Sequence, residues 1–256
     1  MSRSGTGGRT VKATETAFAI IEGLEELDGA RVTQLAEHLE LANSTIHSHL
    51  ATLYEMGYVV QEGDEYQLAS RFLKLGKTAK KRKEAFDLIE PKVKELAEET
   101  EERCQFIVEE HGRGVYLHKE TGSRAVWTDS GLGKRIYLHA TAAGKAVLAN
   151  LPEEQTNQIL DQWGLPALTD NTITDRATLF DELDTIREQG FAVNKEESTE
   201  GLRAVGVPIK DSSGRMVGAL SVSGPSHRMK GEWFNREIPN LLLGTGNELE
   251  LNLKYS

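Results

Sequence analysis

The first 70 residues carry three short segments of helical apolar spacing, and this pattern most limits what the chain can fold into. Apolar residues recur every three or four positions over residues 14–27, which predicts a first helix. A second helix is predicted from Thr33, whose hydroxyl is able to cap its start, to about residue 40. Only residues 41–44 separate it from a third helix that ends at residues 56–57. Helices this short need one another to bury their apolar faces.

Two still shorter segments, residues 58–61 and 66–68, follow the third helix and alternate apolar with polar residues. Residues 62–65 join them and include a glycine, so the pair predicts a β-hairpin. Three short helices and a hairpin, in this order, are typical of a winged helix-turn-helix. Helical spacing returns at Arg71, and a further helix is predicted over about residues 85–101. We interpret these last helices as a linker.

The charge of the chain is unevenly distributed. The formal net charge is −10, from 30 Lys and Arg against 40 Asp and Glu. Residues 1–83 hold eleven residues of each sign, so the whole excess of acid lies in residues 84–256. Net charge governs solubility and long-range repulsion rather than a local contact in a DNA groove, so the acidic total does not exclude DNA binding by the first part.

The third helix has one apolar and one polar face. If Ile46 points to the core, steps of 100° per residue place Leu50 and Leu53 near the same direction. Small polar side chains occupy the other face and the exposed start of the helix, where a recognition helix meets base edges in the major groove. The predicted base-contacting residues are Ser44, Thr45, His47, Ser48 and Thr52. The alternative is an ordinary solvent-exposed face.

Sequence-independent contacts to phosphates need Lys or Arg. The N-terminal arm offers Arg9 and Lys12, which we predict to contact the DNA backbone. The predicted hairpin tip is acidic through Glu62, Asp64 and Glu65, which makes it a poor phosphate contact. The basic run at residues 74–83 is compatible either with phosphate contacts or with a solvated linker.

The rest of the chain alternates predicted strands and helices, which indicates an α+β domain with an antiparallel sheet. The strands are predicted at residues 104–109, 114–118, 124–128, 191–194, 204–209 and 217–223, and the helices at 140–150, 153–163 and 175–189.

Several of these segments resemble the IclR family of transcription regulators. NSTIHSHL at residues 43–50 and GYV at 57–59 are similar to the recognition helix and wing of that family. YLHATAAGKA at 137–146, ESTEGLRA at 197–204 and SVSGP at 221–225 resemble its effector-domain motifs in order and spacing. The resemblance covers about residues 11–250. The family often has Arg where this chain has Ser48, and often a basic or neutral wing; these departures bear on the operator sequence rather than on the DNA-binding role.

The resemblance implies a GAF-like effector-binding domain without catalysis. Ala142 and Ala143 begin a helix, where free backbone N–H groups suit an anionic or carbonyl ligand. Ser221 and Ser223 are two apart on a strand and therefore share one side. The complete predicted effector site consists of Leu132, Ile136, Leu138, Ala142, Ala143, Asn194, Glu197, Ala204, Ser221 and Ser223. For each polar member the alternative is a satisfied turn or strand end.

Other chemistries find little support in the sequence. Cys104 is the only cysteine, which excludes an intrachain disulfide and a multi-cysteine zinc site. Ser221-Val222-Ser223-Gly224 lacks the glycine that opens a nucleophile elbow, and residues 143–146 lack the upstream glycine of a phosphate-binding loop. We therefore predict no catalytic residue, metal or cofactor. The competing hypothesis is a ligand-binding enzyme whose winged helix serves protein contacts; salt-dependent binding to duplex DNA distinguishes the two.

These observations predict two domains, a DNA-binding domain at residues 10–72 and a linker helix with the effector-binding domain at 73–256. The expected partners are a palindromic double-stranded operator, a small-molecule effector such as a small carboxylate or related metabolite, and further copies of the chain as a homodimer or homotetramer. The opening residues lack the apolar segment of a signal peptide, and a cytoplasmic location is expected.

Overall fold

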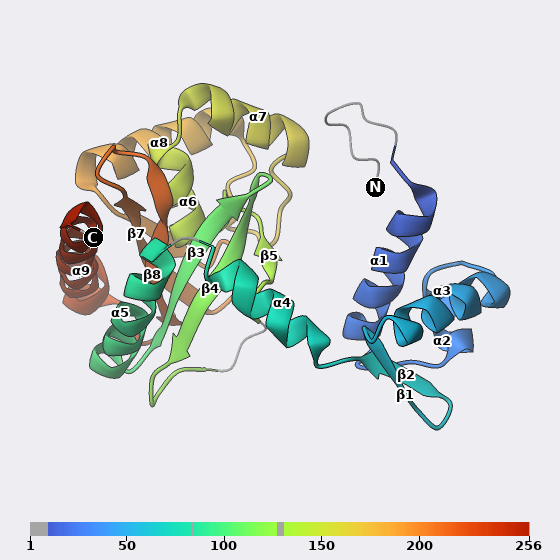
Figure 1. The fold of residues 1–256 in the computed structure, drawn as a ribbon. Coiled ribbons are helices and arrows are strands. Elements are labelled where there is room, and N and C mark those ends of the chain that lie inside the picture. Colours follow the sequence, from blue (N-terminus) through green and yellow to red (C-terminus); the bar gives the residue numbers. More distant parts are fainter. Residues whose placement is uncertain (1–9, 83, 127–130, 256) are drawn as a thin grey trace. The chain divides into compact units, whose positions relative to one another are not determined.

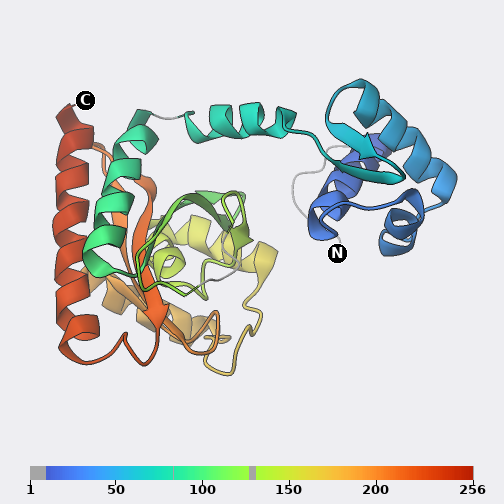
Figure 2. The same cartoon turned by 90° about the horizontal axis from the view of Figure 1, so that it is seen from below.

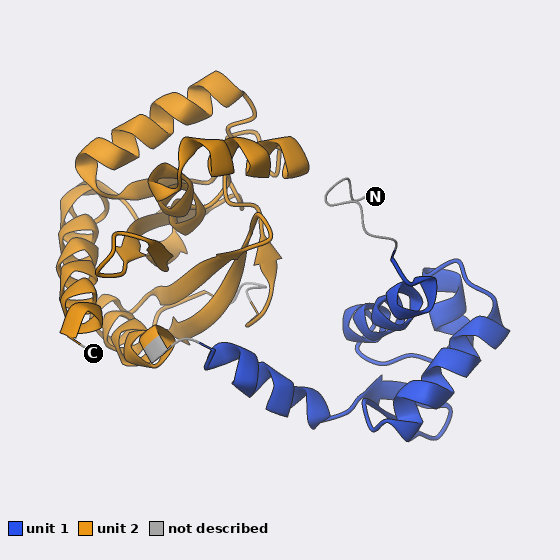
Figure 3. Cartoon of the chain, turned by 45° about the horizontal axis from the view of Figure 1, so that its top comes forward, with its two compact units in different colours: residues 1–82 blue, residues 83–256 orange. Residues whose placement is uncertain are grey.

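The computed structural model describes residues 10–82, 84–126 and 131–255 of the chain. The chain divides into two compact units, residues 1–82 and residues 83–256, which we call unit 1 and unit 2 (Figure 3).

Unit 1, in its described residues 10–82, has three helices, a two-stranded hairpin and a fourth helix (Figure 1). The elements are α1 Lys12–Glu26, α2 Val32–His38, α3 Asn43–Glu55, β1 Val59–Glu62, β2 Glu65–Leu68 and α4 Arg71–Lys80. The two strands are antiparallel, with Val59 opposite Leu68. The predicted winged helix-turn-helix is confirmed.

The core of unit 1 is aliphatic and receives side chains from every element of the motif. Its fully buried members are Ile20, Leu24, Ala30, Leu35, Ile46, Leu50, Leu53 and Val59. Each large member contributes about 1.5–3 kcal/mol by leaving water. The helix α2 has seven residues, too few to be stable alone, so this shared core is what holds it.

The turn between α2 and α3 differs in detail from the prediction. α2 begins at Val32, so Thr33 lies inside the helix and does not cap it. The side chain of Gln34 instead accepts the Arg31 N–H at 2.9 Å. α3 begins at Asn43, which leaves residues 39–42 as the turn, with Glu40 in the left-handed region at φ 53°. The predicted turn at residues 41–44 therefore lies two residues too late in the chain.

Unit 2 is built on one antiparallel sheet in the order β5-β4-β3-β8-β7-β6. The strands are β3 Arg103–Glu110, β4 Arg113–Thr121, β5 Arg135–Ile136, β6 Ala192–Lys195, β7 Leu202–Lys210 and β8 Met216–Pro225. In the centre of the sheet, Arg103 lies opposite Ser223 and Gln105 opposite Ser221. This register places the polar residues of β3 beside those of β8.

Helices cover both faces of the sheet. α5 Glu84–Thr100 and α9 Ile238–Tyr255 pack side by side on one face, and a π-helical turn, Trp233–Glu237, leads into α9 (Figures 1 and 2). α6 Ala142–Asn150, α7 Glu153–Trp163 and α8 Arg176–Gln189 lie on the other face. The expected α+β architecture is confirmed.

The side chains of strand β3 point alternately to the two faces of the sheet. Cys104, Phe106 and Val108 enter the apolar core beneath α5 and α9. Arg103, Gln105 and Ile107 point to the opposite face, where they line a cavity. This alternation follows from the period of two in an extended strand.

Helix α6 rests directly on β7. A Cβ atom at Gly206 would lie 2.7 Å from the Ala143 nitrogen, and one at Gly144 would lie 2.2 Å from the Leu138 oxygen. Gly206 therefore lets α6 approach the sheet this closely, and Gly144 lets the loop that precedes α6 pack against the first turn of the helix. The start of α6 is thereby fixed against the strand that carries Ala204.

One predicted strand is absent, and two elements of unit 2 were not predicted. Residues 124–126 form no strand, and the rest of the strand predicted at 124–128 lies outside the described residues. β5 has only two residues, too few for a period to appear in the sequence. Helix α9 also escaped prediction, because Pro239, Gly244 and Gly246 lower its helix propensity, while packing against β7 supports it.

Candidate functional site

The third helix of unit 1 presents a polar surface. Ser44, His47, Ser48 and Thr52 are exposed and Thr45 is half-buried, while Ile46, Leu50 and Leu53 are buried. The structure therefore places the five predicted base-contacting residues outside the core, as the 100° steps indicated. His49 is half-buried, as expected from its position beside Leu50.

Two hydroxyl groups on this surface have a defined orientation. Ser48 Oγ donates to the Ser44 carbonyl at 2.9 Å, and Thr52 Oγ1 donates to the Ser48 carbonyl at 3.0 Å. With their protons directed along the helix, the oxygens keep lone pairs toward solvent and can act as acceptors. The exocyclic amino groups of adenine and cytosine are the donors in the major groove.

The basic residues of unit 1 lie in different places. Lys12 is exposed at the first position of α1, while Arg9 lies outside the described residues. Lys74 and Lys77 are exposed on α4. At the wing, Arg31 Nε lies 3.1 Å from Asp64 Oδ2 and 3.7 Å from Glu65 Oε1. These contacts offset part of the acidity of the wing tip.

Unit 2 contains a cavity of about 590 Å³ between the sheet and α6. It brings together seven of the predicted effector-site residues: Ile136, Ala142, Ala143, Asn194, Ala204, Ser221 and Ser223. Three others do not line it. Leu132 is 60% exposed, Leu138 is buried in the core beneath α6, and Glu197 lies behind the wall in an ion pair.

The two serines of β8 bind two polar side chains of β3. Ser223 Oγ accepts from Nε and Nη2 of Arg103 at 3.0 and 2.9 Å. Gln105 Nε2 donates to Ser221 Oγ at 3.0 Å. All four side chains are buried and line the cavity, and burial lowers the pKa of Arg103. Ser221 Oγ accepts its bond and keeps its proton for a ligand, whereas Ser223 Oγ also donates to the Arg103 carbonyl at 3.5 Å, a long bond that a ligand acceptor can replace.

Sequence reasoning missed Arg103 and Gln105. Each is an ordinary alternating residue of its strand, and only the pairing of β3 with β8 brings it to the serines. The two strands are more than 100 residues apart in the chain, so no local pattern carries this information.

The first turn of α6 forms another part of the cavity wall. Thr141 caps the helix, since its Oγ1 accepts the Gly144 N–H at 3.1 Å. Ala142 and Ala143 follow and line the cavity. The first amides of a helix have no partner within that helix, and they carry its partial positive charge.

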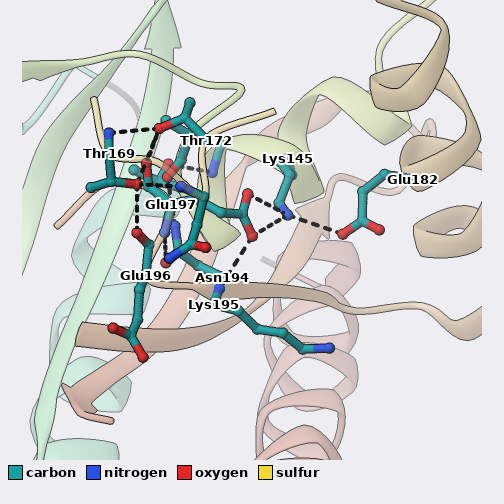
Figure 4. A network of polar contacts seen from close by, with 12 residues as sticks. Lys145, Thr169, Thr172, Glu182, Asn194, Lys195, Glu196 and Glu197 are labelled. Atoms are coloured by element: carbon teal, nitrogen blue, oxygen red, sulfur yellow. Dashed lines mark hydrogen bonds and ion pairs between the residues drawn. The ribbon is translucent and has the colours of Figure 1, made fainter. Parts of the chain in front are cut away.

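A buried polar network supports the rim of the cavity (Figure 4). Lys145, 1% exposed, donates to Glu197 Oε1 at 2.9 Å and to Glu182 Oε1 at 3.0 Å. The backbone N–H of Glu197 also donates to Asn194 Oδ1 at 3.2 Å. Asn194 Nδ2 in turn donates to the Ala140 carbonyl at 2.5 Å. The ion pair thus connects α6 with the segment that follows β6.

The same network reaches a second segment. Thr172 Oγ1 donates to the Glu197 carbonyl at 2.6 Å, and Thr169 Oγ1 donates to the Glu196 carbonyl at 2.7 Å. The two connected segments supply Leu168, Ser198 and Thr199 to the cavity lining. Glu197 therefore acts on the cavity through its neighbours rather than by lining it.

No group of three or more His, Cys, Asp or Glu in the described part of the chain could hold a metal ion. None of the helices described is long and apolar enough to cross a membrane.

A winged helix-turn-helix in one unit and a polar, ligand-sized cavity in the other define a class, the ligand-responsive DNA-binding regulators. The model of the IclR helix-turn-helix domain matches residues 13–63, and that of the bacterial transcriptional regulator IclR C-terminal domain matches residues 78–249. The chain belongs to the IclR family.

Similar proteins with assigned names are also transcriptional regulators. The probable HTH-type transcriptional regulator ArcR of Halobacterium salinarum is 31% identical over 250 residues, which cover 96% of this chain and 95% of the relative. The transcriptional regulator KdgR of Escherichia coli is 31% identical over 234 residues, covering 91% and 89%. The crystal structure of Thermotoga maritima IclR superposes with a TM-score of 0.79 at 29% identity, covering 94% of this chain and 98% of that one.

The protein is therefore a DNA-binding transcription regulator with a C-terminal effector-binding domain. Its relatives are named as transcriptional regulators, not as enzymes.

Proposed function

We propose that α3 binds a palindromic operator and that a small anionic effector in the unit 2 cavity controls this binding. The observation that supports the effector half best is the convergence of Arg103, Ser221 and Ser223 on the cavity that also receives the start of α6. A buried cation, two hydroxyl donors and a helix N-terminus all favour an anion, and a carboxylate is the simplest group that satisfies them.

The DNA half of the proposal assigns base contacts to Ser44, Thr45, His47, Ser48 and Thr52. This assignment is supported by their position: all five side chains lie outside the core, on a helix whose opposite side packs into the core of the motif. Lys12 and Arg9 are assigned to phosphates, because Lys12 is exposed at the first position of α1 and Arg9 lies three residues before it in the sequence.

The effector half assigns ligand contacts to Ala142, Ala143, Ser221 and Ser223, with Asn194, Ala204 and Ile136 completing the wall. Leu138 and Glu197 support that wall from behind, and we assign no contact to Leu132, which is exposed. The effector favours one of two states of the protein, and this differential affinity is what changes operator binding.

We further propose that the chain acts in the cytoplasm as a homodimer or homotetramer, with the reader at residues 10–72 and the linker and sensor at 73–256. A single small reading module buries too little surface for tight specific binding, and a palindrome matches a two-fold dimer. Light scattering on the operator complex should give at least two chains. A monomer of 28.3 kDa on its operator would contradict this.

The test of the sensor uses full-length protein, calorimetry with straight-chain monocarboxylates of two to eight carbons, and an operator duplex selected from a random library. Ser221→Ala and Ser223→Ala should each weaken binding of the best acid by about 1–3 kcal/mol, because each removes a donor to a partly buried acceptor. Ser212→Ala, in the exposed turn between β7 and β8, is the matched control.

Operator affinity without acid should be unchanged in all three variants. If the two β8 variants bind the acids as the wild type does, the cavity serines are structural. If they lose operator binding while folded, the separation of reader and sensor is wrong.

A further inference from the structure

The cavity has a second basic region, distant from Arg103 along the sheet. Arg113 and Arg135 also line it, from β4 and β5. Arg113 lies opposite Glu110, seven positions along β3 from Arg103. At the rise of an extended strand this separates the two backbone positions by roughly 23 Å. We call the Arg103 region the inner end and the Arg113 region the outer end of the cavity.

Aromatic rings and backbone carbonyls hold Arg113 in place. Its guanidinium carbon lies 3.7 Å from the ring centre of Tyr137 and 4.9 Å from that of Trp163. Its Nε donates to the Ile136 carbonyl at 3.0 Å. A guanidinium stacked on rings keeps its edge available for a bidentate anion, so the side chain is oriented before any ligand arrives.

The ring beneath Arg113 is itself fixed. Trp163 Nε1 donates to the His111 carbonyl at 2.9 Å. A Cβ atom at Gly112 would lie 2.6 Å from that nitrogen, so glycine is required for this approach. The guanidinium of Arg135 also lies over Trp163, at 5.4 Å from the ring centre. The guanidinium groups of Arg113 and Arg135 therefore both lie over the indole ring of Trp163.

The outer end holds two positive charges close together, and a bound anion would stabilise this arrangement. Burial lowers the pKa of Arg113, and the neighbouring positive charge of Arg135 lowers it as well. The contacts of Arg113 and Arg135 within the described residues are rings and backbone oxygens, not carboxylates. Arg113 is half-buried, Arg135 is exposed, and both line one wall of the cavity, so two like charges close together there favour a bound anion.

We infer that the effector carries two acidic groups, one bound at the inner end and the other held by Arg113 and Arg135 at the outer end. This inference rests on the proposed function of the inner end as an anion site. The segment between the acids passes Ile107, Tyr116 and Ile136, which line the cavity and suit an uncharged chain. The class includes dicarboxylates and phosphorylated carboxylates, because both present two anions to guanidinium groups.

The experiment compares matched acids on the full-length protein by calorimetry. Straight-chain dicarboxylates of four to sixteen carbons, the longest of which approach the separation of the two ends, are titrated against monocarboxylates of the same lengths. The best dicarboxylate should bind about 10- to 100-fold more tightly than its monocarboxylate, as expected for added bonds to a charged group. A second arm titrates straight-chain phosphonocarboxylates of the same lengths against the monocarboxylates, and the series with the larger gain identifies the second acid as carboxylate or phosphate-like.

Substitutions of the two outer arginines test whether a gain in affinity for the dicarboxylates arises at the outer end. Arg113→Gln and Arg135→Gln should each remove most of the preference for two acids and leave monocarboxylate affinity within about twofold. Arg236→Gln is the matched control, since its side chain is 69% exposed and pairs with the exposed Glu232 at 2.9 Å, in the turn that leads into α9. Unchanged melting temperatures confirm that the variants are folded.

Three results would overturn the inference. If mono- and dianionic acids bind alike while Ser223→Ala still weakens both, the effector has one acidic group and only the proposed function stands. A preference for two acids that survives Arg113→Gln and Arg135→Gln places the second anion elsewhere. If no acid of either series binds, the proposed anion site fails together with the inference.

Discussion

The two units differ in where they keep their polar side chains. Among the described residues, unit 1 buries one polar side chain, Thr16, and its core is otherwise aliphatic. Unit 2 buries Arg103, Lys145 and Glu197 together with a larger set of polar residues: Thr100, Glu102, Gln105, His118, His139, Thr156, Thr172, Asn194, Ser221 and Ser223. A reading surface works at the outside of a stable core, whereas a sensing cavity must bring polar groups inside.

This difference has an energetic consequence. A buried charge costs several kcal/mol unless partners and hydrogen bonds compensate for the lost water. Unit 2 meets this requirement through networks such as the contacts of Lys145 with Glu182 and Glu197. Unit 1 has no comparable requirement in its described residues, so polar substitutions there should affect DNA binding before they affect folding.

The largest expected effect is at Lys145. Lys145→Met keeps most of the side-chain volume but leaves the buried carboxylate of Glu197 without its cation, which should cost about 3–5 kcal/mol of the free energy of unfolding. Urea denaturation followed by circular dichroism measures this. Lys94→Met is the control, because Lys94 is 67% exposed and pairs with Glu98 only at 3.8 Å. A loss below about 1 kcal/mol would mean that the network does not stabilise unit 2.

A second change examines the close contact between helix and sheet. Gly206→Ala puts a methyl group 2.7 Å from the Ala143 nitrogen, so α6 must shift, at a cost of about 1–3 kcal/mol of stability. Gly244→Ala is the matched control: its Cβ meets nothing within 4 Å, and a helical alanine is favourable. Equal stability of the two variants would show that α6 is free to move away from β7.

The smallest expected effect is on the reading surface. Ser48→Ala should leave the urea midpoint unchanged and weaken binding to the selected operator by about 1 kcal/mol, the net value of one neutral hydrogen bond. Fluorescence anisotropy on the selected duplex and on a scrambled one measures both affinity and preference. Ser70→Ala, before α4, is the control. A change in stability instead of affinity would contradict the contrast between the units.

The sequence predicts unit 1 more completely than unit 2. The helices of unit 1 and its hairpin follow from local spacing, because contacts between neighbouring elements build that core. In unit 2 local spacing predicted α6 and β8, and with them the serines. It did not predict Arg103, Gln105 or Arg113, because their positions at the cavity depend on strand pairing and ring stacking between distant segments. Helix α9 was missed for a related reason, since packing rather than propensity sustains it.

The alternation along β3 also constrains how this family member can change during evolution. Substitutions at Arg103 or Gln105 alter the chemistry of the cavity and leave Cys104 and Phe106 in the apolar core. Insertion or deletion of a single residue in the strand is different, because it exchanges the two faces and would direct Phe106 into the cavity and the polar Gln105 into the core. We therefore expect descendants of this gene to acquire new effector preferences by replacing residues at alternate positions of β3, and to keep the length of that strand fixed.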